Sequence, residues 1–128
     1  MEGRARIKEE IMTPKETADK IVKIMDDKKA ENILMLAITD LTILADYFCI
    51  CTATSTTHIK ALSDEIEFRL KREDVAPHHV EGYMSGNWVL LDYGSVIVHL
   101  FTQETREFYS LEKLWADAKK IGPEAGAR

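Results

Sequence analysis

The sequence has little of several residues and patterns that mark particular protein classes. Its 128 residues include only 2 cysteines, 3 prolines and 6 glycines. No apolar stretch approaches the roughly 20 residues that cross a bilayer, and the amino-terminal residues, with Arg4, Arg6 and Glu9, carry charges in place of a signal-peptide apolar region. We therefore expect a cytoplasmic protein, or one of an organelle matrix, with no membrane partner.

The two cysteines, Cys49 and Cys51, stand two positions apart in one apolar run. Two side chains on one strand face cannot easily close a disulfide or build a four-ligand zinc site. We expect reduced thiols in the core.

Positive charge is also in short supply. Lys and Arg number 17 against 22 Asp and Glu, a formal charge of −5, so specific nucleic-acid binding by the chain itself is not expected. The stretch 73–118 holds eight acidic residues against Arg106 and Lys113, a formal −6, interleaved with aromatic residues. This composition fits a surface for a basic protein, and equally fits solvated acids over a buried aromatic core.

The length predicts one domain, which we place at 13–121, between flexible segments at 1–12 and 122–128. Thr13-Pro14-Lys15-Glu16 has the residues of a capping box and predicts a helix start there. A second helix is predicted from Ser55 to about Arg72, because apolar residues recur on one helical face. Thr102 is expected to cap a short helix through Tyr109, and Ser110 to start another that ends before Gly122.

Apolar and β-branched runs predict about five strands. They lie at 32–38, 47–53, 78–83, 88–93 and 96–101. Gly94-Ser95 predicts a tight hairpin between the last two, whereas the first two are either a hairpin with a wide loop or neighbouring strands. The expected fold class is therefore α/β or α+β, a mixed sheet flanked by helices.

Catalytic machinery is not visible in the sequence. The histidines lack the spacing of metal ligands, and we read His99, inside an apolar strand, as a satisfied core or interface imidazole more than as a base. No serine stands in a glycine-flanked elbow, and Thr52-Ala53-Thr54-Ser55 has no glycine to cradle a phosphate. We expect no enzyme, no metal and no cofactor.

One long segment carries a family resemblance. It reads EGYMSGNWVLLDYGSVIVHLF from Glu81, followed by REFYSLEKLWADA from Arg106. With Ala45-Asp46-Tyr47-Phe48, Thr54-Ser55, His58 and Lys60-Ala61 upstream, the chain resembles the Iojap family, the ribosomal silencing factor S proteins, over roughly 13–120.

The resemblance implies a nucleotidyltransferase-like fold without the paired catalytic carboxylates. It also implies a factor that binds the large ribosomal subunit through its protein L-fourteen and blocks joining of the small subunit, and that self-associates as a homodimer. A role in assembly of the large subunit and, less favoured, a nucleotide-binding enzyme of nucleotidyltransferase type are the alternatives.

The resemblance also nominates the residues of a docking surface. They are Glu81, Trp88, Asp92, Tyr93, His99, Arg106, Phe108, Tyr109 and Glu112. For Trp88 and Phe108 a purely structural role is at least as well supported, because a large aromatic residue at strand or helix spacing is usually core. Glu81 and Asp92 are the favoured contacts.

Overall fold

The computed structural model describes residues 12–39, 45–109 and 119–121, with side chains for 12–39 and 45–107. The segments expected to be flexible, 1–12 and 122–128, lie outside the described residues apart from Met12. So do residues 110–118, where the last helix was predicted to begin. No helix of the described part is long and apolar enough to cross a membrane.

The first described helix, α2 (Pro14–Asp27), begins where the capping pattern predicts. The Thr13 side-chain oxygen accepts a hydrogen bond from the Glu16 amide at 3.1 Å, and the Glu16 carboxylate accepts one from the Thr13 amide at 2.9 Å. Both bonds satisfy amides that have no partner inside the helix. The local sequence alone therefore determines this helix start.

Within the described residues, six strands form one mixed sheet in the order β3-β4-β5-β2-β1-β6. Their bounds are β1 (Glu31–Ala37), β2 (Tyr47–Ala53), β3 (His79–Glu81), β4 (Trp88–Asp92), β5 (Val96–Thr102) and β6 (Lys119–Ile121). Only β2 and β5 pair in parallel; the other neighbours are antiparallel. The predicted mixed sheet and the hairpin at Gly94 are confirmed, and the open question about the first two strands is settled as antiparallel neighbours.

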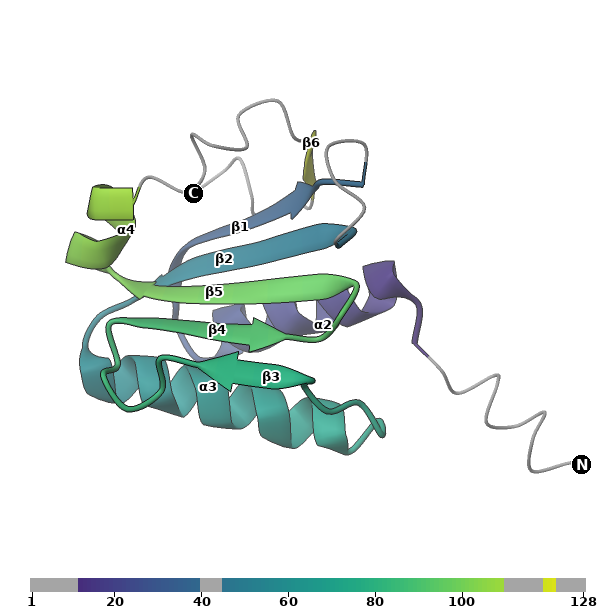
Figure 1. Cartoon of the computed structure of the whole chain (residues 1–128), viewed down its shortest axis with the longest axis horizontal. Coiled ribbons are helices and arrows are strands. Elements are labelled where there is room, and N and C mark those ends of the chain that lie inside the picture. Colours follow the sequence, from purple (N-terminus) through teal and green to yellow (C-terminus); the bar gives the residue numbers. More distant parts are fainter. Residues whose placement is uncertain (1–11, 40–44, 110–118, 122–128) are drawn as a thin grey trace, which may run out of the picture.

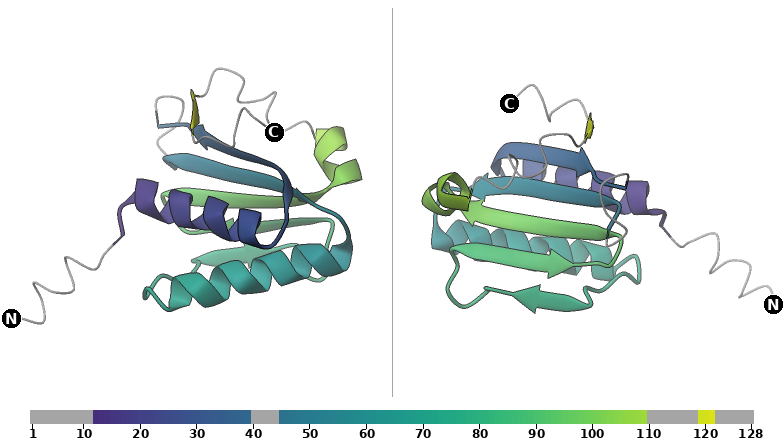
Figure 2. Two further views of the ribbon diagram at one scale, coloured as in Figure 1. Left: turned by 180° about the vertical axis from the view of Figure 1, so that it is seen from behind. Right: turned by 45° about the horizontal axis from the view of Figure 1, so that its top comes forward.

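Helices α2 and α3 (Thr56–Lys71) lie on the same face of the sheet, behind the strands in Figure 1 and in front of them when seen from behind in Figure 2. The short helix α4 (Gln103–Tyr109) follows β5 and lies beside one end of the sheet (Figure 1). The α3 segment is the crossover that parallel pairing of β2 with β5 requires. This arrangement leaves the second sheet face without a described helix across its middle.

The main core lies between the sheet and the two long helices. Ile21 and Met25 of α2 and Leu62 of α3 are fully buried there. Cys49 and Cys51 point into the same layer as reduced, buried thiols, as predicted. Burial raises the pKa of Cys51 to about 12, so this thiol stays protonated and unreactive at neutral pH.

One prediction at the carboxyl end is wrong. Residues 119–121, expected to continue a helix up to Gly122, form strand β6, which pairs antiparallel with β1 and makes the sixth strand of a sheet predicted to have about five. The free edge of β1 offers backbone partners that helical periodicity in the sequence does not report. Tertiary pairing therefore overrides the local pattern here.

Candidate functional site

The face of the sheet turned away from α2 and α3 gathers several of the nominated residues; we call it the open face because no described helix crosses its middle. Leu36, Ile50 and Phe101 on this face are nevertheless buried. One row of cross-strand partners runs Glu81–Leu90–His99–Ile50–Leu34, and a neighbouring row runs Asp92–Ile97–Phe48–Leu36. Directly opposed residues project to the same side of a sheet. Since Trp88 pairs with Phe101 in a third row, Glu81, Trp88, Asp92 and His99 all lie on one face.

The centre of the open face is aromatic. Trp88 lies over Phe101 with ring centroids 5.1 Å apart, and the Phe48 ring meets His99 edge-on at 4.8 Å. His99 stacks on Phe101 at 5.9 Å with nearly parallel planes. Phe48 and Trp88 are half-buried, whereas His99 and Phe101 are buried. Large aromatic side chains that retain part of their exposure are the usual anchors of protein interfaces.

His99 is neutral and holds the indole of Trp88. The Trp88 Nε1–H donates to His99 Nδ1 at 3.1 Å, so the imidazole proton lies on Nε2. Nε2 is buried and has no hydrogen-bond partner among the described residues. Burial lowers the pKa of His99 to about 4. An imidazole with so low a pKa, whose one basic nitrogen already accepts a hydrogen bond, is a poor general base.

Acidic side chains lie at the β3–β4 end of the open face. Glu81 is exposed on β3, where its carboxylate pairs with the His79 ring. Asp92 ends β4, half-buried, and its Oδ1 accepts a hydrogen bond from the Gly94 amide at 2.7 Å. The open face therefore combines an aromatic centre with a negatively charged margin.

Tyr93 does not belong to the open face. The Tyr93 side chain is buried on the helix side of the sheet, with its hydroxyl in the core, and burial together with the nearby Glu67 raises its pKa. It is adjacent to Asp92 in sequence, and alternation along a strand sends adjacent side chains to opposite faces. Phe108 and Tyr109 end α4 with side chains outside the described residues, and Glu112 lies outside them altogether.

Arg106 is structural in this fold. It is 9% exposed, and its Nη1 donates to the Asn32 carbonyl at 2.6 Å and to the Thr52 hydroxyl at 2.9 Å. Asn32 has a φ of +49° at an irregularity in the pairing of β1 with β2. Arg106 thus ties α4 to the two strands and satisfies a carbonyl that the ladder leaves out.

Arg106→Met is expected to lower the free energy of unfolding by about 2 kcal/mol, because it removes charge-assisted hydrogen bonds from the buried Thr52 hydroxyl and from the Asn32 carbonyl. Urea unfolding followed by circular dichroism measures this change. Lys71→Met, an exposed cation on α3, is the matched control and is expected to change little. Equal losses in both variants would contradict a structural role for Arg106.

Sequence reasoning missed part of the open face. Phe48, Leu90 and Ile97 contribute half-buried apolar surface beside the nominated residues. Alternation along the strands would have identified two of them. Leu90 faces the same side as Trp88 and Asp92, and Ile97 faces the same side as His99 and Phe101. Phe48 could not be assigned to this face without the parallel pairing of β2 with β5.

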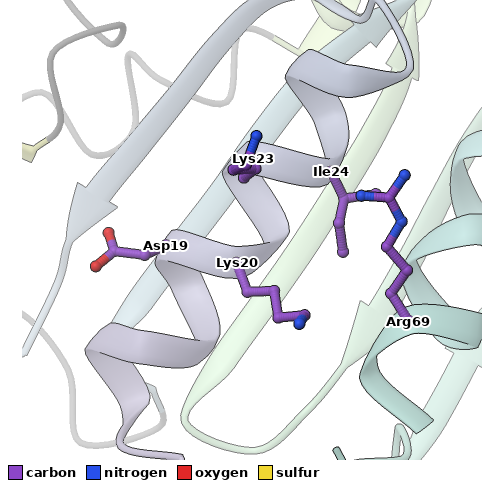
Figure 3. A pocket seen from close by; sticks show the side chains of 5 residues that line it. All are labelled: Asp19, Lys20, Lys23, Ile24 and Arg69. Carbon is purple, nitrogen blue, oxygen red and sulfur yellow. The ribbon is translucent and has the colours of Figure 1, made fainter. Parts of the chain in front are cut away.

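The helix side of the molecule carries a groove of about 300 Å³ between α2 and α3. Figure 3 shows Lys20, Ile24 and Arg69 along the gap between the two helices. Its cations are already paired: Lys20 with Glu73 at 3.0 Å, and Arg69 with Asp27 at 2.9 Å. An anion would have to displace these carboxylates, so the groove is not a candidate anion site.

The histidines and acids of the described part do not assemble a metal centre. No three His, Cys, Asp or Glu side chains there converge as ligands. Both ring nitrogens of His58 are engaged, because Nδ1 accepts from the Thr54 amide at 2.9 Å and Nε2 donates to the Lys28 carbonyl at 2.8 Å. His58 therefore connects the end of α2 to the start of α3.

Comparison with known proteins gives one consistent family. Residues 11–127 match the family model described as "Ribosomal silencing factor during starvation". A ribosomal silencing factor of Bacillus subtilis is 41% identical over 93 residues, covering 73% of this chain and 79% of that protein. A crystal structure of a Chromobacterium violaceum protein, 32% identical, superposes with a TM-score of 0.80 and covers 82% of this chain and 88% of that one.

A more distant relative comes from an organelle. A mouse protein named "Mitochondrial assembly of ribosomal large subunit protein 1" is 33% identical over 100 residues, 76% of this chain and 44% of that longer protein. The chain is therefore similar both to bacterial proteins and to an animal protein with a mitochondrial name.

Proposed function

Because the chain belongs to the ribosomal silencing factor family, we propose that it represses translation by binding the large ribosomal subunit and preventing the small subunit from joining. The docking partner we propose is ribosomal protein L-fourteen, in the cytoplasm. The mechanism is steric, with no bond made or broken. The family name describes a regulator of ribosomes and not an enzyme.

One observation carries this proposal: Glu81 of β3, Trp88 and Asp92 of β4, and His99 of β5 come together on the open face. Aromatic anchors bordered by carboxylates suit a protein surface with apolar hollows and basic side chains. Since α2 and α3 cover the other face, they supply the bulk that would stand in the way of the small subunit.

Reversing the charge at the margin of the open face is expected to weaken docking. For the double variant Glu81→Lys with Asp92→Lys we expect a dissociation constant for large subunits about tenfold higher, because two attractive charges become repulsive. The difference from the unmodified chain is expected to shrink as salt is added. Co-sedimentation of the purified chain with large subunits measures binding, and light scattering of mixed subunits measures joining.

The double variant Asp19→Lys with Asp26→Lys makes the same change of charge at exposed residues of α2, on the opposite side of the molecule, and is the matched control. It is expected to bind and to inhibit joining like the unmodified chain. Thermal unfolding of each variant verifies the fold, because Asp92 also accepts the Gly94 amide. Unchanged binding by a folded double variant would overturn the assignment of the open face.

A role in assembly of the large subunit is the second candidate, and the name of the mouse relative favours it. Both roles use the same docking surface, so binding alone does not separate them. Silencing predicts that the purified chain inhibits joining of mature subunits, whereas an assembly role predicts incomplete large subunits in cells that lack it. The homodimer implied by the family resemblance stays a prediction, which sedimentation velocity of the free chain tests.

A further inference from the structure

Exposed apolar side chains are concentrated along one margin of the described residues. The large hydrophobic residues exposed there are Phe68 (58%) on α3, Val80 (37%) on β3 and Met84 (83%) in the turn after β3. The Arg72 guanidinium lies 5.5 Å from the centre of the Phe68 ring. The Tyr83 hydroxyl, in the turn after β3, donates to the Asp64 carboxylate of α3 at 3.2 Å. The β3 turn and α3 therefore border the same region of the surface, at the margin where β3 ends the sheet in Figures 1 and 2.

The same margin ends the sheet. Strand β3 is outermost in the sheet order, paired on one side with β4 and with no further described strand on the other. An unpaired strand edge presents backbone donors and acceptors that an extended segment of another chain can use. We call this free side of His79–Glu81 the β3 edge.

The two sides of β3 differ in chemistry. Val80 lies opposite Leu91, whose side chain is in the helix-side core, so Val80 faces the side that carries α3 and Phe68. His79 and Glu81 face the open side, where Asp92 is the cross-strand neighbour of His79. A strand added at this edge would therefore meet apolar side chains on one side and carboxylates on the other.

We propose that the β3 edge accepts an extended segment of a partner protein in which apolar residues of valine type alternate with lysine or arginine. The inference rests on the proposed function, because Glu81 and Asp92 also belong to the open face and a partner docked there reaches this edge. A second copy of β3 fits less well, since its residues His79, Val80 and Glu81 include no lysine or arginine to pair with Glu81 and Asp92.

A labelled peptide of alternating lysine and valine is the probe, with fluorescence anisotropy measured against the full chain. We expect saturable binding that weakens with salt, and about tenfold weaker binding of a glutamate–valine peptide of the same length. Glu81→Lys is expected to reverse this preference. Two further lysine–valine peptides test the backbone hydrogen bonds. One is N-methylated at every lysine and the other at every valine, so that each has lost the amide donors on one side of the extended chain. We expect one of the two peptides not to bind and the other to retain most of its binding.

Equal binding of the lysine–valine and glutamate–valine peptides would overturn the proposal. So would unchanged binding of both N-methylated peptides, and neither test needs a protein variant. Val80→Pro is expected to abolish peptide binding and to leave co-sedimentation with large subunits detectable through the open face. If the unmodified chain binds large subunits but no peptide, strand addition alone is wrong. If the folded charge-reversed double variant co-sediments like the unmodified chain, the docking function of the open face is wrong. If the free chain self-associates and Val80→Pro abolishes it, the occupant is a second copy and the proposed partner is wrong.

Discussion

Gly82→Ala is expected to destabilise the chain by about 3 kcal/mol or more, through a left-handed backbone and a steric clash together. Gly82 follows β3 with a φ of +83°, and a Cβ there would lie 2.0 Å from the Trp88 carbonyl oxygen and 3.1 Å from its carbon. Both atoms belong to the backbone of β4, so relief requires the β3–β4 connection to move. Urea unfolding monitored by circular dichroism measures the loss.

Gly94→Ala is the matched control for this substitution. Gly94 has a φ of +85°, and its added Cβ would lie 3.2 Å from Cε1 of the His78 side chain, which can rotate. The two variants share the conformational cost of about 1–2 kcal/mol, and only Gly82→Ala adds a backbone collision. Similar losses in the two variants would show that the close approach to Trp88 contributes nothing. Because Glu81 and Trp88 flank this turn, Gly82→Ala is also expected to weaken binding to large subunits.

Acid is expected to destabilise the chain through His99. Its pKa is about 4 in the fold against 6.5 in the unfolded chain, because burial disfavours the imidazolium. Between these values the unfolded state binds the additional proton. The contribution of neutral His99 to the free energy of unfolding is therefore fully present above pH 6.5. It decreases as the pH falls, by about 3 kcal/mol in total on reaching pH 4. Protonation at Nδ1 would also remove the acceptor of the Trp88 indole.

His99→Gln separates this effect from the titration of the carboxylates. Glutamine can accept the indole hydrogen bond and does not ionise. We expect the free energy of unfolding of the unmodified chain to decrease relative to that of the variant between pH 6.5 and pH 4, measured by urea titration at each pH. A constant difference across this range would show that His99 does not remain neutral in the fold.

Local chemistry made several parts of this structure predictable. The capping residues at Thr13 and Glu16, the apolar stripe of α3 and the glycine at the β4–β5 turn act within a few residues of chain. The cap depends on local backbone hydrogen bonds and the turn on the φ of its glycine, so both can be predicted without the rest of the fold. The stripe of α3 can be read from the spacing of its apolar residues. The grouping of Trp88 with Asp92 was equally readable, since both have the same parity on one strand.

Long-range pairing decided what the open face contains and where it ends. Sequence parity relates residues within a strand but not between strands, so only the β2–β5 register brings Phe48 and Ile50 beside Ile97 and His99. The sheet order likewise made β3 an edge and left Val80 exposed.

By itself, the sequence determined the helix starts, the hairpin, the buried thiols and the family, because these depend on neighbouring residues or on a matched pattern. Only the tertiary structure decided which side chains share a surface. It put Asp92 on the open face and Tyr93 in the core, and it put the charge of Arg106 between two strands. The physical reason is that burial and hydrogen-bond partners are supplied by residues remote in the chain, whose positions depend on strand order and register.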